Sequence, residues 1–224
     1  MKGIEIMVRT IRWMIGALAL CTAGSLAACG SGSGGGGGSG SAALSCQAYC
    51  TSIMASCTGG DGSVDGGAMD PTRTHQQYTG MDQCVATCST FPVGAASDTS
   101  GDTLGCRTYH AGAAAKDPAT HCPHAGPGGD SVCGDLCTSY CRITAKYCTA
   151  ANMAGPLYTS DADCMSWCKA TKSDLRFNIA VQAGDEQACL LYHSQEASVV
   201  PPDHCNGDLA KDPKIMGHGS VTCQ

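Results

Sequence analysis

Cysteine is the residue type in this sequence with the greatest potential for chemistry. The 224-residue chain contains 18 cysteines, and a content of about 8% is typical of chains that disulfides stabilise. Aromatic residues make up only 5% of the chain, so a large apolar core is not expected. We therefore expect covalent cross-links to replace much of the hydrophobic core.

Sixteen of these cysteines form two sets of eight with closely matching spacing. Each set reads C-x3-C-x6-C, then C-x3-C, then C-x15-C, then a last cysteine. Four identical intervals in the same order indicate a duplicated module. The predicted disulfide cysteines are Cys46, Cys50, Cys57, Cys84, Cys88, Cys106, Cys122 and Cys133 in the first copy, and Cys137, Cys141, Cys148, Cys164, Cys168, Cys189, Cys205 and Cys223 in the second.

Histidines recur together with the cysteines. His110 and His121 in the first copy have the same separation as His193 and His204 in the second, and the first copy adds His124. Two or three imidazoles brought together would bind Zn²⁺ or Cu²⁺. We favour the alternative that each histidine packs beside a disulfide or hydrogen-bonds a helix end, because no HExxH-type helix accompanies them. On that interpretation the protein has no cofactor.

The cysteine spacing predicts helices. Cys46, Cys50 and Cys57 fall on one stripe of a helix, and the segment 44–57 contains no Gly or Pro. Cys84 and Cys88 share a face of a second helix. The residues that we expect to cap this second helix are Thr79 or Asp82, and in the second copy Thr159, Ser160 or Asp161.

A third helix is expected to carry the sixth cysteine of each copy. It should begin at Asp102 or Asp185 and end before Pro118 or Pro201, because a proline disfavours helical backbone in the residue before it. The Gly-, Pro-, Ser- and Asp-rich stretches 58–74, 91–101 and 123–131 are predicted to be loops. The predicted fold is a small, disulfide-rich, all-α protein with two tandem homologous modules of about three short helices each, joined by long Gly/Pro loops.

The paired C-x3-C helices resemble the α-hairpinins, in which two antiparallel helices are cross-linked outer to outer and inner to inner. The resemblance covers that motif alone, and the third helix and the four extra cysteines depart from it. It implies the pairs Cys46–Cys88, Cys50–Cys84, Cys137–Cys168 and Cys141–Cys164. Eight cysteines allow 105 pairings, so the other pairs stay open.

The N-terminus has the features of an export signal. Lys2, Arg9 and Arg12 precede the apolar run 13–20, which is too short to span a bilayer. The run leads to Leu26-Ala27-Ala28-Cys29, which resembles the lipobox of bacterial lipoproteins. The resemblance implies cleavage before Cys29 and lipidation of that cysteine, and the acyl chains would hold the protein on a membrane. The alternative is an ordinary secretory signal peptide in which Cys29 is a spare thiol.

A flexible tether is expected to follow the lipidated cysteine. Residues 30–41 are only Gly and Ser, and such a chain has a root-mean-square reach of about 20 Å. Gly30-Ser31 after the cysteine resembles lipoproteins that are sorted to an outer membrane. The predicted organisation is a signal peptide at 1–28, the lipidated cysteine and tether at 29–43, repeat 1 at 44–134 and repeat 2 at 135–224.

The charge of the chain excludes some partners. Removal of residues 1–28 takes away Lys2, Arg9, Arg12 and Glu5, and leaves 10 basic and 18 acidic side chains. An acidic surface without Lys/Arg clusters repels phosphate backbones and anionic headgroups, so we expect no nucleic-acid partner. The expected membrane contact is the lipid anchor, and a protein or envelope partner is not specified.

No motif of an enzyme is present in the sequence. It lacks a C-x2-C redox pair, a haem-attachment motif, G-x-S-x-G and a phosphate-binding loop, so we expect no enzymatic activity. C-x3-C helices also occur in bacterial copper-storage bundles, and that resemblance implies Cu(I) held by thiolates. Those bundles consist of loop-poor helices with reduced thiols, whereas these cysteines also occur in Gly/Pro loops.

The sequence therefore predicts a secreted, lipid-anchored protein of the cell envelope, placed at the outer membrane on its periplasmic or its surface face. The expected function is a binding or interaction module of unknown ligand. The alternatives are a structural envelope protein and a Cu- or Zn-binding or storage lipoprotein. A patch of the recurring tyrosines, if exposed, would favour binding, because tyrosine is enriched in recognition surfaces. The tyrosines concerned are Tyr49/Tyr140, Tyr78/Tyr158 and Tyr109/Tyr192.

Overall fold

The computed structural model describes residues 43–59, 75–151, 157–184, 186–205, 217–218 and 221–223. The predicted signal peptide, Cys29 and nearly all of the predicted tether lie outside these residues. The described residues all belong to one compact unit, residues 40–224. None of the helices described is long and apolar enough to cross a membrane.

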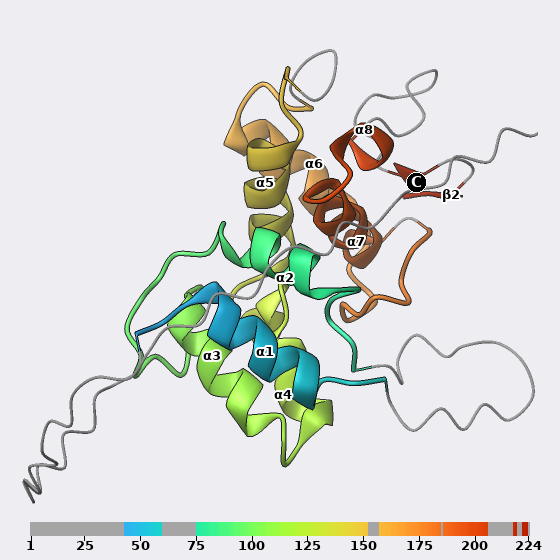
Figure 1. Ribbon diagram of the computed structural model, residues 1–224. Helices are drawn as coiled ribbons and strands as arrows, with labels where there is room; N and C mark the ends of the chain where they lie inside the picture. Colours follow the sequence, from blue (N-terminus) through green and yellow to red (C-terminus); the bar gives the residue numbers. More distant parts are fainter. Residues whose placement is uncertain are drawn as a thin grey trace, which may run out of the picture. The chain divides into compact units, whose positions relative to one another are not determined.

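The regular secondary structure of the described residues is almost entirely helical, which confirms the predicted all-α class (Figure 1). Repeat 1 contains α1 (Cys46–Ser56), α2 (Met81–Cys88), α3 (Leu104–Ala113), α4 (Pro118–Ala125) and the 3-10 helix η1 (Gly129–Ser131). Repeat 2 contains α5 (Leu136–Tyr147), α6 (Asp161–Ala170), α7 (Gln187–Ala197), α8 (Pro201–His204) and an antiparallel pair of two-residue strands, β1 (Gly217–His218) and β2 (Val221–Thr222).

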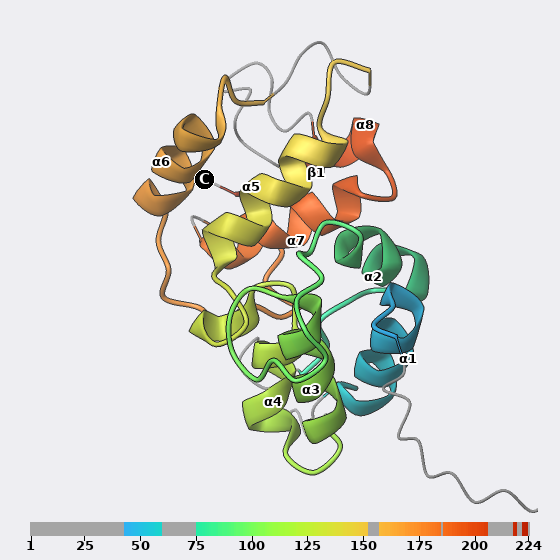
Figure 2. The same cartoon turned by 90° about the vertical axis from the view of Figure 1, so that its left-hand side faces the viewer.

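The main helix contacts correspond in the two repeats (Figure 2). Helix α1 packs against α2 and α3, and α3 against α4, while α5 packs against α6 and α7, and α7 against α8. Tyr49 and Ile53 are buried in the core of repeat 1, and Tyr140 and Ile143 are buried in that of repeat 2.

The helix caps agree with the predictions in part. Ser160 accepts a hydrogen bond from the backbone N–H of Asp163 at the start of α6, as expected for a serine cap. The prediction for α2 was wrong, because Gly80 occupies the cap position and makes no side-chain hydrogen bond there. Asp82 lies inside the first turn, where its charge still interacts favourably with the helix dipole.

The third helix begins later than predicted. Thr103, not Asp102, caps α3, and Glu186 lies at the cap position of α7. Asp185 lies outside the described residues. Asp102 is instead held by arginine side chains, as described below.

Each repeat has a fourth helix, so the prediction of about three was too low. Pro118 and Pro201 begin α4 and α8, since a proline at the first helical position loses no hydrogen bond there. Helix α4 also contains Pro123, so the predicted loop 123–131 is wrong for its first part and for η1. The predicted loop 91–101 is free of helix and strand, and only residues 58 and 59 of the loop 58–74 are described.

All sixteen predicted cysteines form disulfides, and every bond stays within one repeat. Four of the pairs are those that the α-hairpinin resemblance implies, and the other four fasten the fourth helix and the end of each repeat. The pairs are Cys46–Cys88, Cys50–Cys84, Cys57–Cys122 and Cys106–Cys133 in repeat 1, and Cys137–Cys168, Cys141–Cys164, Cys148–Cys205 and Cys189–Cys223 in repeat 2.

Candidate functional site

The duplicated histidines meet in pairs, with the same geometry in both repeats. Nδ1 of His110 on α3 lies 2.8 Å from Nδ1 of His121 on α4. Nδ1 of His193 on α7 lies 3.0 Å from Nδ1 of His204 on α8. The equal sequence spacing therefore produces equal placement, because the turn between the third and fourth helix of each repeat brings the two rings together.

A backbone carbonyl orients the buried ring of each pair. Nε2 of His110 lies 3.2 Å from the carbonyl oxygen of Thr99, and Nε2 of His193 lies 2.9 Å from that of Gln182. A carbonyl oxygen can only accept, so Nε2 carries the hydrogen and Nδ1 keeps its lone pair in the neutral rings. His121 and His204 then donate from Nδ1 across the pair.

Repeat 1 adds a third imidazole to its pair. The centroid of the His124 ring lies 4.9 Å from that of His110 and 6.0 Å from that of His121. One ring nitrogen of each of the three histidines lies within 4.8 Å of the others. The position equivalent to His124 in repeat 2 is Gly207, which is outside the described residues.

The surroundings of His124 leave one of its two ring nitrogens available to a ligand. Nε2 lies 3.5 Å from a carboxylate oxygen of Asp130. Nδ1 is buried and has no hydrogen-bond partner among the described residues. If Nε2 carries the hydrogen toward the carboxylate, Nδ1 presents an unused lone pair.

Burial favours the neutral form of two of the three rings. Desolvation lowers the pKa of His110, and the neighbouring His121 lowers it further, against the hydrogen bond to Thr99. Desolvation and the neighbouring His110 also lower the pKa of His124, while the charge of Asp130 opposes the shift. A neutral imidazole can coordinate a metal ion, whereas a protonated one cannot.

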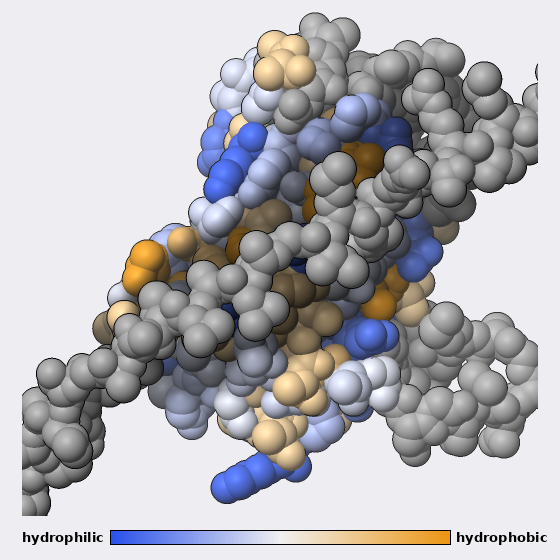
Figure 3. Space-filling view, in the orientation of Figure 1, coloured by the Kyte–Doolittle hydropathy of each residue, from blue (hydrophilic) through white to orange (hydrophobic). Residues whose placement is uncertain are grey.

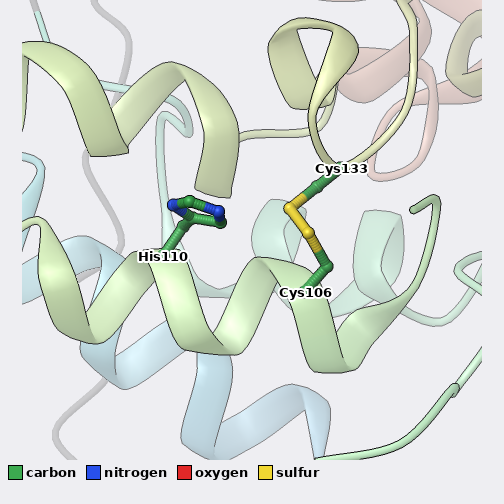
Figure 4. A group of neighbouring side chains, drawn as sticks. All are labelled: Cys106, His110 and Cys133. Atoms are coloured by element: carbon green, nitrogen blue, oxygen red, sulfur yellow. A yellow bond between two sulfur atoms is a disulfide. The ribbon is translucent and has the colours of Figure 1, made fainter. Parts of the chain in front are cut away.

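A disulfide lies beside the buried histidine of each repeat. The Cys106 and Cys133 sulfur atoms lie within 4.8 Å of a ring nitrogen of His110, and the side chain of His110 projects from α3 on the same side as the disulfide (Figure 4). Cys189, His193 and Cys223 repeat this group. His110 and His193 therefore pack beside disulfides, as the alternative to a metal site expects. Each of them also contacts the second histidine of its repeat.

The sulfur atoms themselves are not metal ligands in this structure. Cu(I) storage requires thiolates, and all sixteen cysteines of the two repeats are in disulfides. In this disulfide-bonded state the sixteen cysteines do not offer the free thiolates that Cu(I) storage requires. The imidazoles are the candidate ligands that remain.

Three of the six recurring tyrosines are buried in the core. Tyr49, Tyr78 and Tyr140 are buried, and the hydroxyl oxygens of Tyr49 and Tyr78 lie 2.8 Å apart. Burial raises the pKa of all three above its ordinary value. Tyr109 is half exposed, at 51%. A recognition surface built from all six tyrosines is therefore excluded.

Two cavities of about 330 Å³ each are present among the described residues. One lies between the repeats and is bounded by Asp130, Leu136 and Arg176, among others. The second lies in repeat 2 beside the Cys141–Cys164 disulfide and Leu157. On the face drawn in Figure 3, strongly hydrophobic colour forms separate patches and not one continuous surface.

The sequence did not point to Asp130 or to the buried Arg107 as site or core residues. Asp130 adopts a left-handed backbone conformation, with φ 46°, which places it between His124 and Arg176 of repeat 2. An aspartate tolerates this conformation better than most residues. The Gly-rich stretch 126–131 was the one available signal, and it predicted a loop without indicating a contact.

The comparisons with known proteins match part of the chain. Residues 69–139 match the model of the BfoA family C-terminal domain, and this stretch contains His110, His121, His124 and Asp130. The aurasperone B biosynthesis cluster protein A of Aspergillus niger, from two strains, and the bifonsecin B biosynthesis cluster protein A of Aspergillus brasiliensis are each 34% identical to the chain over 91 residues.

The similarity covers 40% of this chain and 30% to 31% of the fungal proteins. The chain therefore spans less than a third of the length of the curated relatives it matches. No solved structure matches the chain significantly.

Proposed function

We propose that the protein is an exported, lipid-anchored binding module of a bacterial cell envelope. The observation that carries this proposal is that all sixteen cysteines after the tether are in disulfides. Disulfides of this number persist in oxidising compartments outside the cytoplasm. The lipobox-like segment 26–29 and the Gly/Ser stretch 30–41 supply the matching export signal, anchor and stalk.

The binding element that we propose is the histidine cluster of repeat 1. Three imidazole nitrogens lie within 4.8 Å of one another there, and the buried Nδ1 of His124 has no hydrogen-bond partner among the described residues, an arrangement that a ligand can use and a structural spacer does not need. The names of the fungal relatives place them in biosynthesis clusters and give no molecular role, so they favour neither function. Binding at the cell envelope is the function that this geometry supports best.

The proposed lipidation and membrane localisation are tested by expressing the full chain in a Gram-negative host with an alkyne-labelled fatty acid. We expect label in the wild-type protein and in Cys21→Ala, which removes the other leader cysteine. Cys29→Ala should carry no label and should leave the membrane fraction. Equal labelling of Cys29→Ala, or absence of label from the wild-type protein, would contradict lipidation at Cys29. An inhibitor of the lipoprotein signal peptidase should in addition leave the unprocessed precursor.

A further inference from the structure

We infer that His110, His121 and His124 form a binding site for one divalent transition-metal ion, Zn²⁺ or Cu²⁺, in repeat 1. This inference rests on the proposed binding function and names its ligand. It does not depend on lipidation, because the three histidines and their supporting residues all lie in the disulfide-bonded body.

The nitrogen separation in the pair is already that of two ligands on one ion. Two imidazole nitrogens bound at about 2.0 Å lie about 2.8 Å apart for a right angle at the metal and about 3.3 Å apart for a tetrahedral angle. The observed separation between Nδ1 of His110 and Nδ1 of His121 is 2.8 Å. A metal ion would therefore need little change in the distance between the two nitrogens, and each ring would turn so that its lone pair points at the ion and not at the other nitrogen.

Only one proton must move for this pair to become two ligands. Nδ1 of His110 already keeps its lone pair, because its Nε2 bonds the Thr99 carbonyl. His121 must release the hydrogen on Nδ1 and take one on Nε2, which is a change of tautomer without net loss of a proton. The ring of His121 is partly exposed, so water can exchange that proton.

His124 supplies the third ligand and Asp130 supports it. A carboxylate that holds the second nitrogen of a metal-bound histidine fixes the ring and raises its basicity. Asp130 lies 3.5 Å from Nε2 of His124, and the buried Nδ1 lacks a partner among the described residues. Three histidines with a fourth position open are a common donor set for zinc.

Repeat 2 provides an internal comparison. It has the same pair, His193 and His204, at nearly the same separation. At the position of His124 it has Gly207, which offers no side-chain ligand. Because each further ligand strengthens the site, we expect repeat 1 to fill first and repeat 2 to bind much more weakly.

The test titrates the mature, detergent-solubilised protein with ZnCl₂ and, separately, CuCl₂, using calorimetry and metal analysis after dialysis. We expect one ion to remain per chain. His124→Gln should weaken its binding at least tenfold, and Asp130→Asn should weaken it by about 10- to 100-fold. His204→Gln and His75→Gln are the matched controls, and both should leave the tight site unchanged.

An electron paramagnetic resonance spectrum of the Cu²⁺ form reports the ligands directly. We expect coupling to three imidazole nitrogens in the wild-type protein and to two in His124→Gln. This result does not require the variants to have wild-type stability, and an intact mass verifies that each variant has formed all eight disulfides. Absence of retained metal, or equal loss of affinity in His204→Gln and His124→Gln, would overturn the site. The labelling experiment at Cys29 is unaffected by either outcome.

Discussion

Asp102 and Arg107 form an ion pair between a partly exposed carboxylate and a buried guanidinium, in which Oδ1 of Asp102 lies 2.9 Å from Nη1 of Arg107. The side chain of Arg107 is fully buried and also donates to the carbonyl oxygens of Gly126 and Pro127. Asp102 makes a second ion pair with Arg142 on α5 of repeat 2. One carboxylate therefore neutralises a charge in the core of repeat 1 and connects the two repeats.

Replacement of Asp102 by Asn should destabilise the protein by about 3 kcal/mol, because it leaves the Arg107 charge buried without its counter-ion. Urea unfolding followed by circular dichroism measures the change. Asp82→Asn, at the exposed first turn of α2, is the control and should cost less than about 1 kcal/mol. A loss at Asp102 as small as that at Asp82 would show that Arg107 is satisfied by carbonyl groups alone.

The same ion pair predicts a loss of stability in acid. Burial alone would raise the pKa of Asp102, but the hydrogen bond from Arg142 and the charge of Arg107 outweigh it and lower the pKa below its ordinary value. An aspartate with a lowered folded-state pKa contributes stability that is fully present above the unfolded pKa, near 4. That contribution should disappear as the pH falls from about 4 through the folded-state pKa.

Unfolding free energies between pH 7 and pH 2 test this prediction. The difference between the wild-type protein and Asp102→Asn should be constant above about pH 5 and should shrink below pH 4. A difference that stays constant down to pH 2 would refute the role of the Asp102 charge.

Two glycines in α3 should respond in opposite ways to the same substitution. A Cβ on Gly105 would lie 1.9 Å from the carbonyl oxygen of Ala95, so Gly105→Ala should destabilise the protein by about 1–3 kcal/mol. A Cβ on Gly112 would meet no atom within 4 Å, so Gly112→Ala should stabilise the helix by about 0.5 kcal/mol. Thermal unfolding of the two variants checks the signs, and a gain at Gly105 would mean that the 92–98 loop moves away.

The duplicated spacing of Cys and His predicted most of the local architecture, because each repeat closes its own disulfides within a few short helices. In the sequence, the only sign that His110 and His121 act together was that His193 and His204 have the same separation in the second copy. That sign did not indicate the direct contact of the two rings. Contacts between repeats could not be predicted. Asp102 looked like a helix start, whereas its partners are Arg107 and an arginine 40 residues away on α5.

Comparison of the repeats explains why Arg107 was missed. The equivalent residue of repeat 2, one position after the sixth cysteine, is Leu190, which is also fully buried. The module therefore needs a long buried side chain there, and a charge is not required by the helix pattern. The arginine is satisfied in repeat 1 by Asp102, whose position depends on tertiary structure.

The Cys57–Cys122 disulfide should hold the histidine cluster together, because Cys122 lies on α4 between His121 and His124. It closes 65 residues, and the Cys46–Cys88 disulfide closes 42. In the chain-entropy estimate, loss of either bond costs about 4 kcal/mol, so the two double-alanine variants are matched in global stability. They differ in what they release, since the first removes the disulfide that holds α4 to the end of α1, while the second removes one of the two disulfides that hold α2 to α1 and leaves Cys50–Cys84 in place.

Hydrogen exchange read segment by segment separates the two effects. In Cys57→Ala/Cys122→Ala, the amides of α4 should exchange faster relative to those of α1 and α3, because α4 can then open locally. In Cys46→Ala/Cys88→Ala the faster exchange should appear in α2, and α4 should keep its protection relative to α3. Metal affinity should fall in the first variant and persist in the second. Equal exchange of α4 in both variants would show that the contacts of α4 with α3, and not the disulfide, position His121 and His124.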